Sequence, residues 1–154
     1  MEVNGEYRIE VDREVVWTAL NDDNILRQAI PGCESLQRIS DTDLDARVQL
    51  KVGPVVVKLS AKIKLKDLDP PRGYTISGDG KGGPAGFVKG EARVSLEDVG
   101  GATLLRYDVD ARLGGKLGQL GSRMIDATTK KIAAEFFGKF SELLAPAQAE
   151  TLSK

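Results

Sequence analysis

Hydrophobic and polar residues alternate along most of the chain up to residue 113, which is the pattern of half-buried β-strands. The alternation is cleanest from Val55 to Leu65, where valine, leucine, alanine and isoleucine point one way and a row of lysines points the other. Short turns rich in glycine and proline separate the segments, so successive strands pair antiparallel. The predicted strands span residues 2–10, 43–52, 55–68, 73–80, 86–97 and 103–113.

Three segments carry helical signals instead. Asp12 is a candidate N-cap for a helix over 13–20, and a second short helix over 23–30 ends at Pro31. The stretch 114–140 predicts a long helix that presents one apolar face. This order indicates an α+β fold in which a curved antiparallel sheet of about seven strands wraps around the last helix. The apolar face of that helix comprises Leu117, Gly121, Met124, Ile125, Thr128, Ile132, Phe136, Phe140 and Leu143.

The last predicted helix has small side chains on its apolar face near its N-terminus and large ones near its C-terminus. Glycine stands at 114, 115, 118 and 121, whereas Phe136 and Phe140 come later. We interpret this as a ligand cavity open at the glycine end and sealed by the two rings, so Gly121→Leu is expected to abolish ligand binding. The alternative is that the glycines only let the helix approach the sheet closely. The predicted cavity residues are Val48, Leu50, Ile63, Leu65, Tyr74, Ile76, Tyr107, Val109, Leu117, Leu120, Gly121, Met124 and Thr128.

Composition narrows the function classes. The 154 residues suit one domain, predicted over 1–144, with a flexible polar tail over 145–154. The chain has 22 Lys and Arg residues and 23 Asp and Glu residues, so it lacks the excess of positive charge that is typical of nucleic-acid-binding proteins. Histidine is absent and Cys33 is the single cysteine, so no metal site is predicted, and Cys33 is interpreted as a small buried residue. With no signal peptide or membrane-length apolar run, we expect a cytoplasmic protein.

A second group of residues is predicted to form a lid or a contact surface. Phe87 ends a glycine-rich loop and has outward parity, and Phe137 stands beside a predicted basic stripe rather than on the apolar face. These aromatic residues are candidates for contact with lipid or with a partner protein. Local packing explains Phe87 equally well, and for Phe137 an ordinary single exposed aromatic is the favoured interpretation. The basic stripe consists of Lys116, Arg123 and Lys130.

Two motifs resemble one known family. The Ile30-Pro31-Gly32-Cys33 phrase after a Val-Trp helix and the segment Leu117–Arg123 are similar to the G subunit of carbon monoxide dehydrogenase, the CoxG family of the START-like, helix-grip (SRPBCC) superfamily. The resemblance covers about residues 1–144 and implies a helix-grip fold with a deep apolar cavity. It also implies an accessory role beside a molybdenum hydroxylase of the carbon monoxide dehydrogenase type, with transient contact at the inner face of the membrane. A respiratory quinone or other prenyl lipid is the implied ligand, with no covalently bound cofactor.

Three function classes stay open on this basis. The first is a non-enzymatic carrier or adaptor for a hydrophobic ligand. The second is an interaction module that docks the hydroxylase at the membrane or assists its maturation. The third, a small-molecule enzyme on the same fold, requires a positioned acid, base or nucleophile. The inward-facing strand positions supply tyrosines but no carboxylate pair, which disfavours catalysis.

Overall fold

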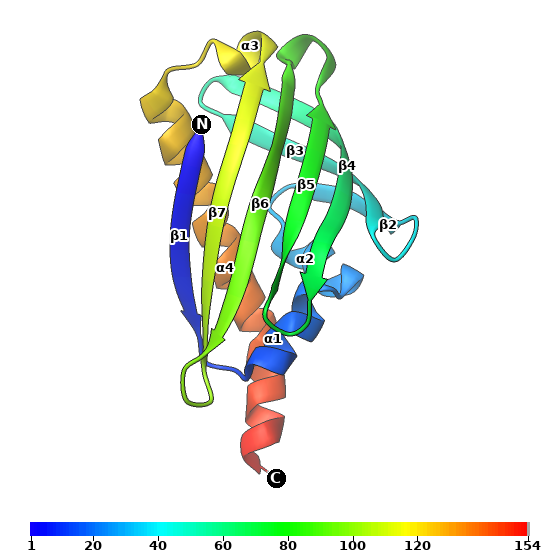
Figure 1. Cartoon of the computed structure of the whole chain (residues 1–154). Coiled ribbons are helices and arrows are strands. Elements are labelled where there is room, and N and C mark those ends of the chain that lie inside the picture. Colours follow the sequence, from blue (N-terminus) through cyan, green and yellow to red (C-terminus); the bar gives the residue numbers. More distant parts are fainter. Residues whose placement is uncertain (154) are drawn as a thin grey trace.

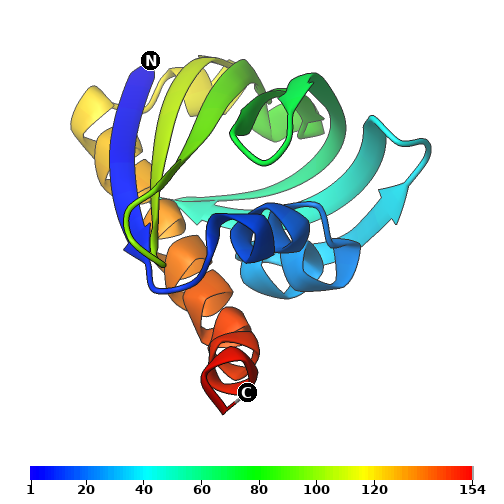
Figure 2. The ribbon, with the colours of Figure 1, turned by 60° about the horizontal axis from the view of Figure 1, so that its bottom comes forward.

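The computed structural model describes the backbone of residues 1–153 and the side chains of residues 1–144. A single sheet curves around a long C-terminal helix, with two short helices at the side of that helix (Figures 1 and 2). This confirms the predicted α+β helix-grip architecture. In chain order the elements are β1 (Glu2–Ile9), α1 (Arg13–Leu20), α2 (Asp23–Ala29), β2 (Cys33–Arg38), β3 (Asp43–Val52), β4 (Val55–Asp69), β5 (Gly73–Lys81), the 3₁₀ turn η1 (Gly83–Ala85), β6 (Phe87–Asp98), β7 (Thr103–Gly114), α3 (Gly115–Gly118) and α4 (Ser122–Ser153).

The sheet has seven strands in the described part of the chain, in the order β1-β7-β6-β5-β4-β3-β2, and every neighbouring pair is antiparallel. Burial alternates along the strands with the predicted parity, so Leu44 and Leu65 face inward while Lys62 and Lys64 face solvent. The pleat of the strands therefore fixes which side chains can line the interior. The sequence pattern did not predict β2, a short edge strand that pairs with β3 and carries an irregularity after Cys33.

The two short helices begin as predicted, but their first turns are capped differently. Asp12 occupies the N-cap position of α1 without a capping hydrogen bond from its side chain. Asp22 caps α2, because its carboxylate oxygen accepts hydrogen bonds from the backbone N–H groups of Asn24 and Ile25 at 2.9 and 3.2 Å. The helix α2 packs against both α4 and β2, which places it beside the interior of the sheet.

The long C-terminal helix does not include the glycine-rich segment. The chain forms the short α3 over Gly115–Gly118, breaks, and begins α4 at Ser122, so the prediction of one helix starting at residue 114 is wrong. Gly121 stands at this break, and its carbonyl oxygen accepts the first hydrogen bonds of α4 from Met124 and Ile125. α4 continues through Ser153 and includes residues predicted as a tail. The flexibility predicted for that tail lies outside the described side chains and stays a prediction.

Two hydrophobic clusters fill the inside of the sheet. The larger one joins α1, α2 and the part of α4 around Phe136 to Leu144 to the sheet, with Phe140 and Leu105 among its most buried members. The smaller one lies at the α3 end, where Leu117 packs with apolar residues of α4, β3 and β4. At the glycine end the inside of the sheet is therefore packed, although a surface hollow of about 490 Å³ lies beside Gly118 and Leu120. The apolar cavity lies instead beside Phe136 and Phe137, at the end that was predicted to be sealed.

Candidate ligand cavity

An apolar cavity of about 390 Å³ lies between the concave face of the sheet, α2 and the middle of α4. Alternating inward positions of six strands supply one wall, and successive turns of α4 supply the other. Among the described residues that line it, Arg38 is the only charged one. Its volume lies near the lower end of the range of about 300–1,000 Å³ for small-molecule sites. The main lining residues from the sheet are Leu36, Ile63, Leu65, Tyr74, Ile76, Ala92, Val94, Tyr107 and Val109, and those from α4 are Thr129, Ile132, Ala133, Phe136 and Phe137.

Six of the predicted cavity residues line this cavity, and all six come from strands. They are Ile63, Leu65, Tyr74, Ile76, Tyr107 and Val109. Leu117 belongs to the second core cluster, with Leu120 packed against it, while Leu50 and Thr128 line a separate groove on the outside of α4. Val48, half-buried, is not among the lining residues. Strand parity therefore located inward positions correctly, but it did not tell which end of the sheet is hollow.

The predicted roles of Gly121 and Met124 are wrong. Gly121 is exposed, and a β-carbon added there meets no described atom within 4 Å, so a larger side chain enters solvent rather than the cavity. Met124 is 38% exposed and lies against Gly53 in the turn between β3 and β4. Neither residue touches the cavity. The expectation that Gly121→Leu abolishes ligand binding therefore loses its structural basis.

Phe137 is also placed differently from its prediction. It is only 9% exposed and lines the cavity instead of standing beside the basic stripe on the surface. Its ring centroid lies 4.1 Å from that of Tyr7 and 5.8 Å from that of Tyr107, and Phe136 packs edge-on against it at 5.0 Å. The ring of Tyr107 in turn packs directly against the backbone of Gly5, and a β-carbon at residue 5 would clash with this ring. An aromatic stack therefore joins α4 to β1 and β7 along one side of the cavity.

Tyr74 supplies the polar group best placed to meet a ligand. Its side chain is 6% exposed, its ring packs against Trp17 at 5.1 Å, and it lines the cavity. Burial alone raises the pKa of Tyr74 above its ordinary value, and no hydrogen bond joins its hydroxyl group to another described side chain or backbone group within residues 1–144. Among the described residues, Arg13 Nε is the fully buried side-chain nitrogen or oxygen without a partner, so the unpaired Tyr74 hydroxyl oxygen retains some accessible surface. This group is therefore available to donate a hydrogen bond to a ligand oxygen.

The burial of Tyr74 predicts a specific loss of stability in alkali. Because the folded state holds the phenol proton more tightly than the unfolded state, stability is complete below the ordinary tyrosine pKa of about 10 and falls above it. In the wild type, the free energy of unfolding should decrease by about 1.4 kcal/mol per pH unit above pH 10 because of this group. We expect Tyr74→Phe to abolish that decrease. Urea unfolding of both proteins from about pH 8 to about pH 11.5, a range that brackets the ordinary tyrosine pKa, measures the difference. Tyr107→Phe, at a half-buried tyrosine, should remove less, and identical slopes for wild type and Tyr74→Phe would contradict the prediction.

Arg38 lines the cavity beside α2. Its guanidinium group donates hydrogen bonds to both carboxylate oxygens of Asp23, with distances of 2.8–3.1 Å, and to the carbonyl oxygen of Asp41 at 3.1 Å. The hydrogen bond to Asp23 raises the pKa of Arg38. This paired fork ties β2 to the first turn of α2. The charge of Arg38 is therefore already compensated at the cavity wall.

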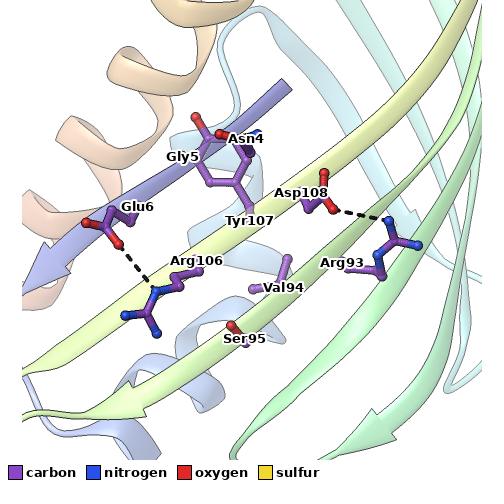
Figure 3. Close-up of a pocket in the computed structure, with 9 residues that line it drawn as sticks. All are labelled: Asn4, Gly5, Glu6, Arg93, Val94, Ser95, Arg106, Tyr107 and Asp108. Atoms are coloured by element: carbon purple, nitrogen blue, oxygen red, sulfur yellow. Dashed lines mark hydrogen bonds and ion pairs between the residues drawn. The ribbon is translucent and has the colours of Figure 1, made fainter. Parts of the chain in front are cut away.

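Another hollow, of about 460 Å³, lies over β1, β7 and β6 where polar side chains face solvent (Figure 3). Ion pairs cross it between Arg106 and Glu6 at 3.3 Å and between Arg93 and Asp108 at 3.2 Å. All four side chains are more than half exposed, and such surface pairs contribute little to stability. This surface is a ladder of cross-strand ion pairs rather than a site for chemistry.

The other predicted contact residues lie on the surface. Phe87 is 40% exposed, and its ring covers Gly114 on the neighbouring strand, which confirms its outward orientation. It does not line the cavity, and residues 82–86 form the short loop before it. Cys33 is half-buried, and burial raises the pKa of its thiol, which leaves it protonated. The three basic residues of the predicted stripe, Lys116, Arg123 and Lys130, are all exposed.

Comparison with models of known protein families shows to which family this chain belongs. The family described as the G subunit of carbon monoxide dehydrogenase (CoxG) matches residues 5–145. This protein belongs to the CoxG family. No curated protein matches the chain. Within the described residues, no helix of this CoxG protein has both the length and the apolar character needed to cross a membrane.

Solved structures agree with the CoxG fold. A conserved protein from Geobacillus kaustophilus is 33% identical, with a TM-score of 0.90 over 96% of this chain and 97% of the other. A START superfamily protein from Mycobacterium smegmatis has a TM-score of 0.74 at 13% identity over 95% and 98%. The Zhui aromatase/cyclase from Streptomyces sp. R1128 has a TM-score of 0.62 at 15% identity over 92% of each chain. The family and the fold together support a helix-grip protein that binds a hydrophobic ligand.

Proposed function

We propose that this CoxG protein is a non-enzymatic carrier or adaptor for a respiratory quinone or another prenyl lipid. In this role it links a molybdenum hydroxylase of the carbon monoxide dehydrogenase type to the membrane. The observation that supports the proposal most directly is the apolar cavity of about 390 Å³ with Tyr74 among its lining residues. Apolar walls supply affinity, because each buried methylene contributes roughly 0.8 kcal/mol. The Tyr74 hydroxyl supplies orientation for one carbonyl oxygen of the head group.

The chemistry of the cavity wall favours binding over catalysis. Among the described residues, its lining includes tyrosine, threonine and an ion-paired arginine but no aspartate, glutamate or cysteine. General acid–base or nucleophilic catalysis needs a titratable group within reach of the substrate. Burial moves the pKa of Tyr74 further from neutrality, which makes it a weaker acid. The aromatase/cyclase similarity concerns the fold.

Mass spectrometry of bound lipid tests the proposal. The purified protein is incubated with membranes of its host, re-isolated and extracted with organic solvent. We expect close to one molecule of quinone or other prenyl lipid per protein, and a preparation treated identically but unfolded in urea serves as the control. A protein that returns from the membranes without such a lipid would contradict the carrier role.

A second candidate is an interaction module that docks the hydroxylase. It is favoured by the exposed apolar side chains of Phe87 and Val56, 40% and 57% exposed, which pair across strands with Lys81 and Lys51. Apolar side chains among lysines suit a protein or lipid surface. The double variant Phe87→Ser and Val56→Thr would then lose co-purification with the hydroxylase, while cavity variants would keep it.

A further inference from the structure

An outer groove of about 470 Å³ runs along the outside of α4, against the end of β3. Pro31 and Ile132 line both this groove and the inner cavity. The two spaces are therefore neighbours separated by these side chains, both of which are half-buried. The residues of the groove are Pro31, Gly32, Gln49, Leu50, Lys51, Gly53, Ala127, Thr128, Lys131, Ile132 and Glu135.

The inner cavity by itself is small for a prenyl lipid. At about 390 Å³ it lies near the lower limit for sites that enclose a drug-sized molecule, so a ring system with a long chain exceeds it. The outer groove offers additional apolar surface next to the cavity, from Leu50, Ala127 and Ile132. Because Pro31 and Ile132 line both spaces, the groove is the nearest surface for the part of the ligand that does not fit inside, once these two half-buried side chains move apart.

We propose that the ligand is longer than the cavity, with its polar head at Tyr74 and its hydrocarbon chain leaving between Pro31 and Ile132 into the outer groove. This inference rests on the proposed function and adds a second binding subsite to it. Two observations fix the direction. The side chain of Tyr74 is 6% exposed and lines the inner cavity, and its unpaired hydroxyl oxygen retains accessible surface that an uncharged carbonyl of a ligand can meet. The groove carries Lys51 and Lys131 but also Glu135, so its mixed charge provides no site for an anionic head.

The test is a series of 1,4-naphthoquinones that share one head group and differ in the length of their isoprenoid chain, from a chainless quinone upward. Trp17 is the single tryptophan and packs against Tyr74, so quenching of its fluorescence by the quinone ring reports occupation of the inner cavity. Affinity should increase by about fourfold for each methylene equivalent that leaves water. The increase should continue beyond the chain length that the inner cavity holds, until the groove is filled.

Two variants separate the head from the chain. Ala127→Glu places a carboxylate in the groove at an exposed helical position, and Ala134→Glu is its matched control, exposed on the same helix but in neither space. We expect Ala127→Glu to weaken binding of the long-chain quinones at least tenfold and to leave the chainless quinone unchanged. Tyr74→Phe should weaken every member of the series by the same factor.

The possible outcomes separate the chain site from the carrier role. If the chainless quinone binds but affinity does not rise with chain length, or if Ala127→Glu affects all members equally, the groove is not a chain site and the inference is overturned. If affinity rises but Tyr74→Phe changes nothing, the direction of the ligand is wrong and the inference fails. If no member of the series binds, both the quinone-carrier role and the inference are contradicted.

Discussion

Leucine at both Ala92 and Ala133 is expected to abolish binding of a hydrophobic ligand without weakening the fold. Ala92 on β6 and Ala133 on α4 line opposite walls of the cavity. Each substitution directs a larger side chain into the cavity that we propose as the ligand site. We expect at least a hundredfold loss of affinity for the double variant in Trp17 quenching. The stability of the ligand-free protein should be unchanged or higher by about 0.5–2 kcal/mol, as is common when a cavity is filled.

The control for this prediction lies on the same helix. Ala134 follows Ala133 in α4 but is exposed and lines neither the cavity nor the groove, so Ala134→Leu makes the same chemical change outside the site. It should bind ligand like wild type. A double variant at 92 and 133 that keeps wild-type affinity while remaining folded would show that the ligand binds elsewhere.

Strand parity explains why much of the fold could be predicted. A period of two is unambiguous over long segments, so the interior positions of β4 and β7 were identified from sequence, Leu65 and Leu105 among them. The edge strand β2 was not predicted because its sequence, CESLQR, contains few apolar residues and an irregular register after Cys33. Edge strands bury little, so hydrophobic patterning carries weak information about them.

The last helix shows why the cavity end was predicted wrongly. The predicted apolar face starts at Leu117, which lies before the break between Gly118 and Ser122. Within α4 it also follows steps of three and four residues, and such a repeat drifts around an α-helix by about 20° per heptad. Counted within α4 at about 100° per residue, Phe137 lies about 60° from Phe140, whereas Met124 lies about 160° from it. Phe137 therefore belongs to the buried stripe and Met124 to the solvent side. The glycines mark the break and the turn into α4, not a gap in the core.

The volume and the position of the cavity could not be predicted from the pattern of hydrophobic and polar residues. Leu36, Ile76 and Ile132 are hydrophobic whether they meet a neighbouring side chain or an empty space. The difference depends on how far α2 and the sheet stand apart, which is decided by long-range contacts such as the Arg38–Asp23 pair. Tyr74 was identified from parity, but its hydrogen-bonding surroundings became visible only in three dimensions.

Alanine at Phe137 is expected to cost about 3–5 kcal/mol of folding stability, more than any other single substitution proposed for this protein. Its ring is 9% exposed and stacks on Tyr7 at 4.1 Å, so truncation removes buried apolar area and aromatic contacts that join α4 to β1. The void created adjoins the existing cavity, which leaves few atoms to relax into it. Since folded domains are stable by only about 5–15 kcal/mol, this is a large fraction of the total. Urea unfolding followed by circular dichroism measures it.

Phe87→Ala is the matched comparison, because it makes the same truncation at a ring that is 40% exposed on the outer face of the sheet. Its cost should be about 1 kcal/mol or less, the value of a cross-strand contact such as that with Gly114. A large cost for Phe137→Ala with a small one for Phe87→Ala assigns Phe137 to the core and leaves Phe87 for contact with a partner. Equal, small costs would instead place Phe137 on the surface beside the basic stripe, and the aromatic lining of the cavity would then consist of Tyr74, Tyr107 and Phe136.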